Sequence, residues 1–321
     1  PDRRLPMTQL RHAPDNLSFS RFKVTPSDRA IGADLHIDDV QTLDETAIRE
    51  IKKAAVAYQV VRIRGQALGA AAVVHFAKRI GDPTVRGQET DEAKDSPRRD
   101  NKLTDDRFPE IGAVSNIVEN GAPQGAYGNK ELFWHSDMVT REKPASFTVL
   151  YAVEAPSGEG QTAFTSVTLA AETLPPERLA ELSELSLKNS GAANAAGLVE
   201  GFDEITDVTT SPGRVHPLVS AHPETGRPAL FLGRRMHAYI TGLPVEESEK
   251  LLDEVWARAT QERFQWEQDW RPGDLVIFDN RGVLHRRNPF SPEKRRLLQQ
   301  IVLRGEHPVI RWRPAPRTEA A

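Results

Sequence analysis

Two short segments, far apart in the sequence, carry residues that can bind a metal ion. Residues 133–137 (FWHSD) contain His135 and Asp137, and residues 279–285 (DNRGVLH) end at His285. Two imidazoles and one carboxylate are the ligand set of a non-haem iron(II) site that keeps coordination positions open. Residues i and i+2 of a β-strand point to the same face, so a strand here would let His135 and Asp137 hold one ion. The triplet alone is weak evidence, because a hydrogen-bonded surface pair gives the same pattern.

The third ligand must come from elsewhere in the chain, which has nine histidines. His285 is favoured because it follows a strand-like run at 275–278 and a turn. His237 is the serious competitor, since it follows Gly-Arg-Arg-Met and can line a substrate pocket. The remaining histidines lie in the N-terminal part or before prolines, where structural roles are expected: His12, His36, His75, His216, His222 and His307.

An arginine beyond His285 can bind the far carboxylate of a keto acid. Arg296 stands at the start of a strand-like run, and a guanidinium matches a carboxylate bidentately. Its neighbour Arg295 would point to the opposite face of a strand, so the two cannot share a role. Thr162 can add a hydroxyl hydrogen bond to the same carboxylate. Alternatively, Thr162 is an ordinary strand threonine. Arg296 is then only one member of a basic cluster that forms a solvated face or an anion-binding site: Arg281, Arg286, Arg287, Lys294, Arg295 and Arg296.

Composition limits the class of protein. The chain has 321 residues, 38% of them hydrophobic and 27% charged, which indicates a soluble globular protein. A net charge of −4 argues against nucleic-acid binding. The absence of cysteine excludes disulfides, thiolate nucleophiles and iron–sulfur clusters. No apolar run has the length of a membrane span, and an exchangeable ferrous ion suits a reducing, cytoplasmic compartment.

The order of the expected elements predicts the fold. Apolar spacing predicts helices at 42–58, capped by Asp44, and at 69–80, with a strand at 60–64 between them. Short strands separated by turn signals follow, at 113–118, 132–139, 147–153, 162–166, 228–232, 264–270, 275–279 and 297–303, with helical inserts at 167–174, 176–188 and 244–260. Many short strands in one domain predict a mainly β fold with α, an α+β class whose core is a double-stranded β-helix, or jelly roll, with flanking helices.

Three segments fall outside this regular pattern. Residues 1–20 are expected to be a flexible lead-in and 313–321 a flexible tail, which leaves a single domain at 21–312. Residues 85–109 are highly charged and lack periodicity. A loop of that length is usually disordered or functional, so we consider it a candidate lid over the site.

Taken together, these segments resemble the taurine/2,4-dichlorophenoxyacetate dioxygenase family of Fe(II)- and 2-oxoglutarate-dependent enzymes. The resemblance extends over most of the chain, roughly from Thr25 to Arg304. Several ordered motifs at compatible spacing are far more specific than the triad alone. They are IGADL at 31–35, QVVRIR at 59–64, FWHSD at 133–137, GEGQT at 158–162, HPLV at 216–219, HPETGR at 222–227 and GDLVIFDNR at 273–281, followed by His285 and Arg296.

The resemblance implies a set of roles. His135, Asp137 and His285 match the iron ligands, and Thr162 and Arg296 match the residues that bind 2-oxoglutarate. Iron(II), 2-oxoglutarate and O₂ would then oxidise a small organic substrate, by hydroxylation that can lead to cleavage at a carbon–heteroatom bond, with release of succinate and CO₂. Desaturation or cyclisation is the alternative outcome. Relatives are often dimers or tetramers, so a homo-oligomer without a nucleic-acid or membrane partner is expected.

One position departs from the family pattern. Members that act on sulfonates or aryloxy acids typically place a second arginine on the same strand face as Arg296, and here that residue is Gln300. An amide lacks the charge of a guanidinium, so another arginine must replace it or the substrate is neutral or zwitterionic. Candidate substrate-binding residues are Arg86, Asn116, Tyr127, Glu131, Arg234, Arg235, His237 and Gln300.

Two other classes of function share this triad. A cupin-like isomerase or hydrolase would use a different divalent metal and would have no need of Arg296 and Thr162. A non-catalytic jelly-roll binding protein would have lost the site, which the intact triad argues against. Turnover without 2-oxoglutarate would favour the first class, and failure to bind iron would favour the second.

Overall fold

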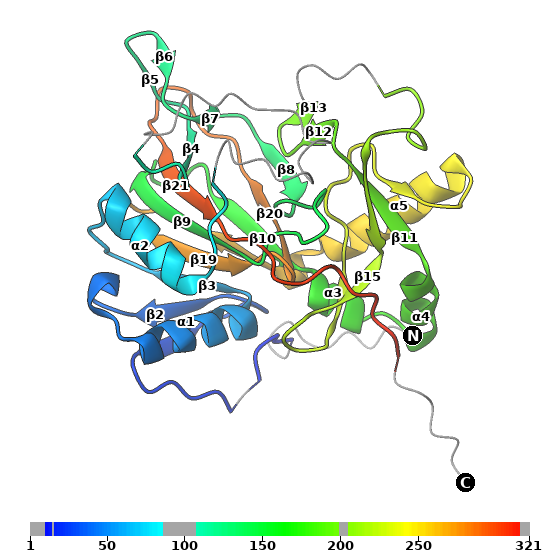
Figure 1. The fold of residues 1–321 in the computed structure, drawn as a ribbon, viewed down its shortest axis with the longest axis horizontal. Coiled ribbons are helices and arrows are strands. Elements are labelled where there is room, and N and C mark those ends of the chain that lie inside the picture. The colour runs from blue at the N-terminus through cyan, green and yellow to red at the C-terminus, as the bar shows by residue number, and fades with distance from the viewer. Residues whose placement is uncertain (1–9, 15, 86–106, 199–204, 315–321) are drawn as a thin grey trace.

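The computed structural model describes residues 10–14, 16–85, 107–198 and 205–314. Strands make up most of the regular structure, with few helices (Figure 1). Arg86 and nearly all of the candidate lid at 85–109 lie outside the described residues, as does most of the expected tail at 313–321. Within the described part, no helix has the length and apolarity needed to cross a membrane.

The largest sheet has eight strands in the order β1-β2-β3-β19-β9-β21-β4-β7. Most neighbours are antiparallel, but β2 runs parallel to β3 and β4 runs parallel to β7. In sheet order the strands are Lys23–Pro26, Ala33–His36, Val60–Ile63, Leu275–Asp279, Phe147–Glu154, Leu297–Val302, Gly112–Ser115 and Ala126–Tyr127.

A second sheet has four strands in the order β18-β10-β20-β8, all antiparallel. In that order they are Gln265–Gln268, Thr162–Ser166, Val283–Arg287 and Leu132–His135. The two sheets meet at aromatic residues: the ring of Phe164 on β10 lies 5.0 Å from that of Phe278 on β19. This contact places the small sheet against one face of the large one.

Shorter strands extend the structure around the two sheets. A three-stranded sheet has the order β14-β11-β17, and three two-stranded ribbons pair β12 with β13, β15 with β16 and β5 with β6. The bounds are β5 Val118–Glu119, β6 Ala122–Pro123, β11 Ser186–Ser190, β12 Ala193–Asn194, β13 Gly197–Leu198, β14 Gly213–Pro217, β15 Val219–Ala221, β16 Pro228–Leu230 and β17 Tyr239–Ile240.

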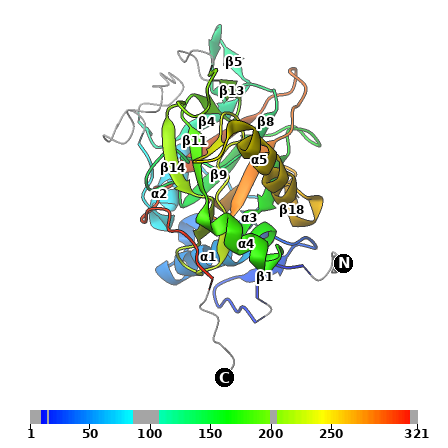
Figure 2. The same cartoon turned by 90° about the vertical axis from the view of Figure 1, so that its right-hand side faces the viewer.

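Helices cover the sheets on two sides. Helices α1 and α2 contact the large sheet through β3, β19 and β21. On the other side of the molecule α3, α4 and α5 pack near β15, β16 and β17, as the two views show (Figures 1 and 2). The helices are α1 Glu45–Tyr58, α2 Ala70–Ile80, α3 Val167–Glu172, α4 Pro176–Glu184 and α5 Val245–Ala259, with 3₁₀ turns at Val40–Thr42 and Glu262–Phe264. Asp44 caps α1 as expected, since its side chain accepts from the Ala47 amide.

Alternate residues of the large sheet supply two separate cores. On β19, Leu275 and Ile277 pack with α1 and α2 in one apolar cluster, which we call the outer core. Val276 and Phe278 belong to a second cluster with Phe164 of the small sheet, the inner core. Both faces of β19 are fully buried, which explains its continuous apolar sequence.

The sequence predictions fail at specific boundaries. The helix expected at 176–188 ends at Glu184, and Leu187 and Lys188 instead pair with β14 and β17. The strand expected at 113–118 ends at Ser115, and the strand expected at 132–139 ends at His135. In each case tertiary pairing overrides a local pattern that continues further. Part of the expected lead-in also packs on the domain, because His12 is buried and its Nδ1 lies 2.8 Å from the Ala57 carbonyl oxygen.

Candidate metal and keto-acid site

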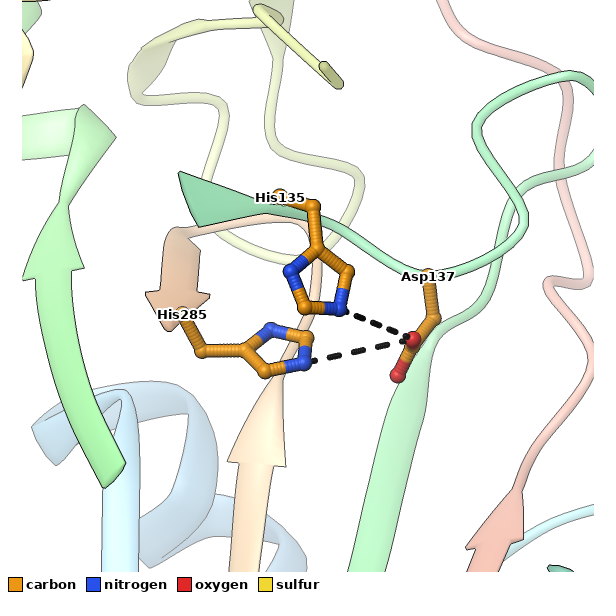
Figure 3. A group of neighbouring side chains, drawn as sticks. All are labelled: His135, Asp137 and His285. Atoms are coloured by element: carbon orange, nitrogen blue, oxygen red, sulfur yellow. Dashed lines mark ion pairs between the residues drawn. The ribbon is translucent and has the colours of Figure 1, made fainter. Parts of the chain in front are cut away.

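His135 and Asp137 from one segment meet His285 from a segment far along the sequence (Figure 3). Nε2 of His135 and Nε2 of His285 each lie 4.0 Å from Oδ1 of Asp137. One ligand atom from each residue can be chosen so that all three lie within 4.8 Å of one another. Two atoms that each lie about 2 Å from a common ion are at most about 4 Å apart, so these side chains are gathered closely enough to share one ion once it draws their ligand atoms together.

The two histidines are brought together by strand pairing. His135 is the last residue of β8 and lies directly opposite His285 on β20, with ring centroids 4.0 Å apart. Asp137 lies beyond the end of β8, so the expected strand alternation of His135 and Asp137 is wrong. The chain turns instead, and Met138 has a φ of +54°. Ser136 fixes this turn, because its Oγ donates to the Val283 carbonyl at 2.9 Å.

Burial keeps both imidazoles neutral. His135 and His285 are 7% and 6% exposed. Burial, followed by the nearby His285, lowers the pKa of His135 to about 3, and burial with the charge of Arg234 lowers the pKa of His285 to about 3. Nδ1 of His135 lies 2.7 Å from the Phe133 carbonyl oxygen and therefore carries the proton, which leaves the Nε2 lone pair facing Asp137. Neutral imidazoles of this kind are ready to bind a metal without first losing a proton.

A chain of hydrogen bonds orients Asp137. Thr148 of β9 donates through Oγ1 to Asp137 Oδ2 at 2.7 Å, and Asn280 Nδ2 donates to the same hydroxyl at 2.8 Å. The Asn280 side-chain oxygen in turn accepts from the Asp137 amide at 3.2 Å. Because Oδ2 is occupied by Thr148, Oδ1 is the oxygen left to face the two imidazoles.

A buried ion pair supports the segment that carries Asn280. Asp279 accepts from Arg281 Nε at 2.7 Å, and its Oδ2 lies 2.9 Å from His222 Nε2. Burial alone would raise the pKa of Asp279, but Arg281 and His222 hold it well below its usual range. A permanently charged Asp279 therefore fixes the turn between β19 and β20, from which Asn280 and His285 both extend.

The cavity in front of the triad holds the two residues expected to bind a keto acid. Thr162 and Arg296 line it together with the three metal-site residues. Trp270 Nε1 donates to Thr162 Oγ1 at 2.9 Å, so the threonine hydroxyl hydrogen stays available to an acceptor in the cavity. Arg296 is 1% exposed, and its Nε and Nη1 have no hydrogen-bond partner in the part of the chain that the structure describes.

These residues fit a carboxylate. Burial, together with the nearby Arg287, lowers the pKa of Arg296 to about 9. A buried cation without an anion is costly, whereas a carboxylate bound in the cavity would accept from this guanidinium and balance its charge. Arg295 points away, as expected, and pairs on the surface with Glu154 at 2.7 Å.

Five of the predicted substrate-binding residues line one of two pockets. Tyr127 and Gln300 line the cavity. Arg234, Arg235 and His237 line a separate pocket beside α5, where Arg235 pairs with Glu249 and Asp253. Arg234 nonetheless forms an isolated β-bridge with His135, so its backbone lies at the edge of the metal site.

The structure places two predicted substrate contacts in positioning roles. The side-chain oxygen of Asn116 accepts from the Arg296 amide at 3.0 Å, and its Nδ2 donates to the Lys294 carbonyl at 2.8 Å. Asn116 therefore holds the start of β21, and its contact with a substrate stays a prediction. Glu131 lies 3.6 Å from Arg286 on the next strand and does not line the cavity.

Sequence reasoning missed several residues that shape the site. Thr148, Asn280 and Trp270 act through other side chains, and no local motif marks such a role. From the sequence, Arg287 is placed only in a basic cluster, although its spacing from His285 indicates that it faces the site. If 283–287 is extended, Arg287 shares a face with His285.

Comparison with known proteins identifies relatives for nearly the whole chain. The family model "Taurine catabolism dioxygenase TauD, TfdA family" matches residues 22–302. Pentalenolactone F synthase from Streptomyces arenae is 30% identical over 312 residues, covering 91% of this chain and 98% of that protein. The alpha-ketoglutarate-dependent 2,4-dichlorophenoxyacetate dioxygenase of Cupriavidus pinatubonensis is 31% identical over 273 residues, covering 82% of this chain and 91% of that protein. The crystal structure of AAD-2 in complex with Mn(II) and N-oxalylglycine has a TM-score of 0.73 at 25% identity, covering 90% of this chain and 99% of that one.

Proposed function

Because the chain belongs to the TauD, TfdA family of dioxygenases, we propose that it is an iron(II)- and 2-oxoglutarate-dependent dioxygenase acting on a small organic substrate. His135, Asp137 and His285 are the proposed iron ligands, and Thr162 and Arg296 the proposed ligands of the far carboxylate of 2-oxoglutarate. When bound, iron(II), 2-oxoglutarate and O₂ supply oxidation of a substrate C–H bond with release of succinate and CO₂.

The protein's own residues bind and orient in this scheme. The two neutral imidazoles and Oδ1 of Asp137 would hold the ion, and the cavity that they line would receive the keto acid. Thr148 keeps Asp137 from rotating, and Arg296 with Thr162 fixes the far end of the keto acid. Leu150 and Leu298 line the same cavity and make part of its wall apolar.

The observation that carries this proposal is the buried guanidinium of Arg296, which has no anionic partner within the described part of the chain and lines the same cavity as the triad. A cupin-like isomerase or hydrolase would gain nothing from a buried cation facing its metal. A binding protein that had lost its metal site would have no reason to keep both the triad and the buried Arg296. A dicarboxylate that chelates the metal at one end and meets Arg296 at the other uses every part of the arrangement.

The reaction outcome and the architecture are finer parts of the proposal. Hydroxylation is our first choice, with desaturation or cyclisation as the alternative. Relatives are named both as a synthase, pentalenolactone F synthase, and as a 2,4-dichlorophenoxyacetate dioxygenase, so we keep both outcomes. We also propose that the two facing sheets form a double-stranded β-helix within a single domain at 21–312. A homo-oligomeric state and a cytoplasmic location stay predictions.

Anaerobic spectroscopy tests the cofactor chemistry without a substrate. Fe(II) and then 2-oxoglutarate are added to the protein, and the weak visible charge-transfer band of a chelated keto acid is recorded. The band should be lost in His135→Ala and should need far more 2-oxoglutarate in Arg296→Ala. Absence of the band from the unmodified protein, with iron loading confirmed, would contradict the proposal. Substrate-dependent succinate release from candidate acids would then identify the substrate class.

A further inference from the structure

A second buried arginine shares the cavity with Arg296. Arg287 is 3% exposed and lines the cavity together with Arg296, Thr162 and the metal-site triad. Both guanidinium groups lie near the ring of Phe290, at 5.4 Å for Arg287 and 5.9 Å for Arg296. Two buried cations against one ring, facing one cavity, are an unusual arrangement that requires an explanation.

Strand register directs Arg287 into the cavity. It lies two residues beyond His285 on β20, so the two side chains point to the same face. On one side Arg287 pairs with Thr162 of β10, and on the other with Leu132 of β8. Its neighbours across the sheet therefore include a residue that we assign to 2-oxoglutarate.

A structural role accounts for only part of the Arg287 side chain. Nη2 donates to the carbonyl oxygens of Tyr127 and Lys130, which tethers the segment between β7 and β8. Nε and Nη1 are buried and have no hydrogen-bond partner among the residues that the structure describes. A tether alone would be served by a shorter or neutral donor, without the cost of burying a full charge.

The charges around the cavity do not balance without a further anion. Asp137 is the one acidic residue among the described cavity-lining residues, and Arg286 is partnered by Glu131. Doubly charged iron and Arg296 are matched by Asp137 and the dianion of 2-oxoglutarate. The charge of Arg287 is then left over.

We propose that Arg287 is a second carboxylate-binding side chain of this site, an inference that rests on the proposed function. The carboxylate has two possible sources: the far end of 2-oxoglutarate, shared with Arg296, or an acidic substrate. The charge balance favours the substrate. Arg287 then supplies, from a neighbouring strand, the positive charge that is absent at Gln300, and the substrate is an organic acid with one negative charge.

Two binding measurements separate the sources. In the first, 2-oxoglutarate and 2-oxopentanoate, which lacks the far carboxylate, are titrated anaerobically into Fe(II)-loaded protein and followed by the charge-transfer band. In the second, acetate, benzoate and phenoxyacetate are titrated by calorimetry into the Fe(II)-loaded protein, with and without 2-oxoglutarate. Each is performed on the parent protein and on Arg287→Gln, which keeps a donor for the tether but loses the charge.

The expected result is a loss of about tenfold or more in the affinity of at least one monocarboxylate in Arg287→Gln, with 2-oxoglutarate bound as in the parent. Arg287→Lys, which keeps the charge, should recover part of that affinity. If 2-oxoglutarate alone weakens, and 2-oxopentanoate does not, Arg287 binds the carboxylate of the co-substrate instead, which also supports the proposal.

Matched controls keep the test interpretable. Arg295→Gln removes an arginine next to Arg296 that pairs on the surface with Glu154 and Glu119, and it should change neither titration. Circular dichroism and thermal melting establish that Arg287→Gln is folded. A folded variant that binds 2-oxoglutarate and all three monocarboxylates as the parent does, strongly or not at all, would overturn the proposal. Absence of the band from the parent would contradict the proposed function, while the calorimetric titrations would still decide the role of Arg287.

Discussion

The two faces of the large sheet share the same strands but differ in chemistry. On the outer face Val149, Tyr151 and Ile277 pack with α1 and α2 into an apolar core. On the inner face Thr148 donates to Asp137, and Leu150 lines the metal-site cavity together with Arg296, which directly precedes β21. The outer face is packed mainly by apolar groups, while the inner face carries Arg296, whose Nε and Nη1 lack partners among the described residues.

Consecutive residues of a strand point to opposite faces of the sheet. A residue that stabilises the fold therefore lies directly next to one that serves the site. Burial of apolar groups stabilises the outer core in the free protein. The inner face keeps charges that are costly until a ligand neutralises them. Substitutions on the outer face should therefore change the free energy of unfolding, and those on the inner face should change the affinity for metal or keto acid.

The largest expected effect is loss of the metal site with the fold retained. His285→Ala removes one of three ligands, so Fe(II) binding and the 2-oxoglutarate band should fall below detection. The metal-free variant should melt within a few degrees of the metal-free parent, at most about 8 °C away, because Nδ1 of His285 has no partner to lose among the described residues. Anaerobic titration and thermal melting measure the two quantities. Iron binding at parental affinity would remove His285 from the ligand set.

The outer face should show the reverse pattern. Ile277 is fully buried, so Ile277→Ala should lower the free energy of unfolding by about 2–5 kcal/mol, measured by urea denaturation. The folded fraction should bind Fe(II) and 2-oxoglutarate with parental affinity. Ile277→Val, as the control, should cost only about 0.5–1.5 kcal/mol. A weaker metal site in the folded alanine variant would show that the two faces are coupled.

The buried imidazoles predict how the stability of the metal-free protein depends on pH. His135 and His285 have a folded pKa of about 3 and an ordinary unfolded value of 6.5, so below pH 6.5 the unfolded chain binds protons that the folded protein does not. Stability should therefore fall as the pH drops from 6.5 toward 3, by up to about 1.4 kcal/mol per pH unit for each histidine. Above pH 6.5 these groups contribute no slope.

Urea denaturation at several pH values tests this expectation. His285→Gln, which cannot be protonated, should show a shallower loss of stability with falling pH than the parent. Identical slopes in the two proteins would mean that the His285 imidazole is not held neutral by burial.

The smallest expected effect concerns the orientation of Asp137. Thr148→Val keeps the shape of the side chain but removes the hydroxyl that donates to Oδ2, so Fe(II) affinity should fall about tenfold. Thr148→Ser restores the donor and should bind nearly as the parent does. Competition against a metal-sensing dye measures both. Equal affinity in the valine and serine variants would assign Thr148 to packing alone.

Much of this protein follows from its sequence. Periodicity and turn residues located β10 and β19 at their observed bounds and α1 and α5 within a few residues, since each has strong local signals. The types and spacing of His135, Asp137, His285 and Arg296 pointed to an iron and keto-acid site. Residue type alone carries this information, because few side chains can bind a metal or a carboxylate.

Tertiary structure decided what local patterns cannot express. It ended β8 at His135 and reached Asp137 through a turn, because that turn is held by hydrogen bonds from Ser136 to a distant strand. It placed Asn116 behind Arg296 and buried Arg287 at the cavity wall, with an Nε and an Nη1 that have no partner among the described residues. These outcomes depend on which strands become neighbours, and strand pairing across more than a hundred residues is set by the packing of the whole domain.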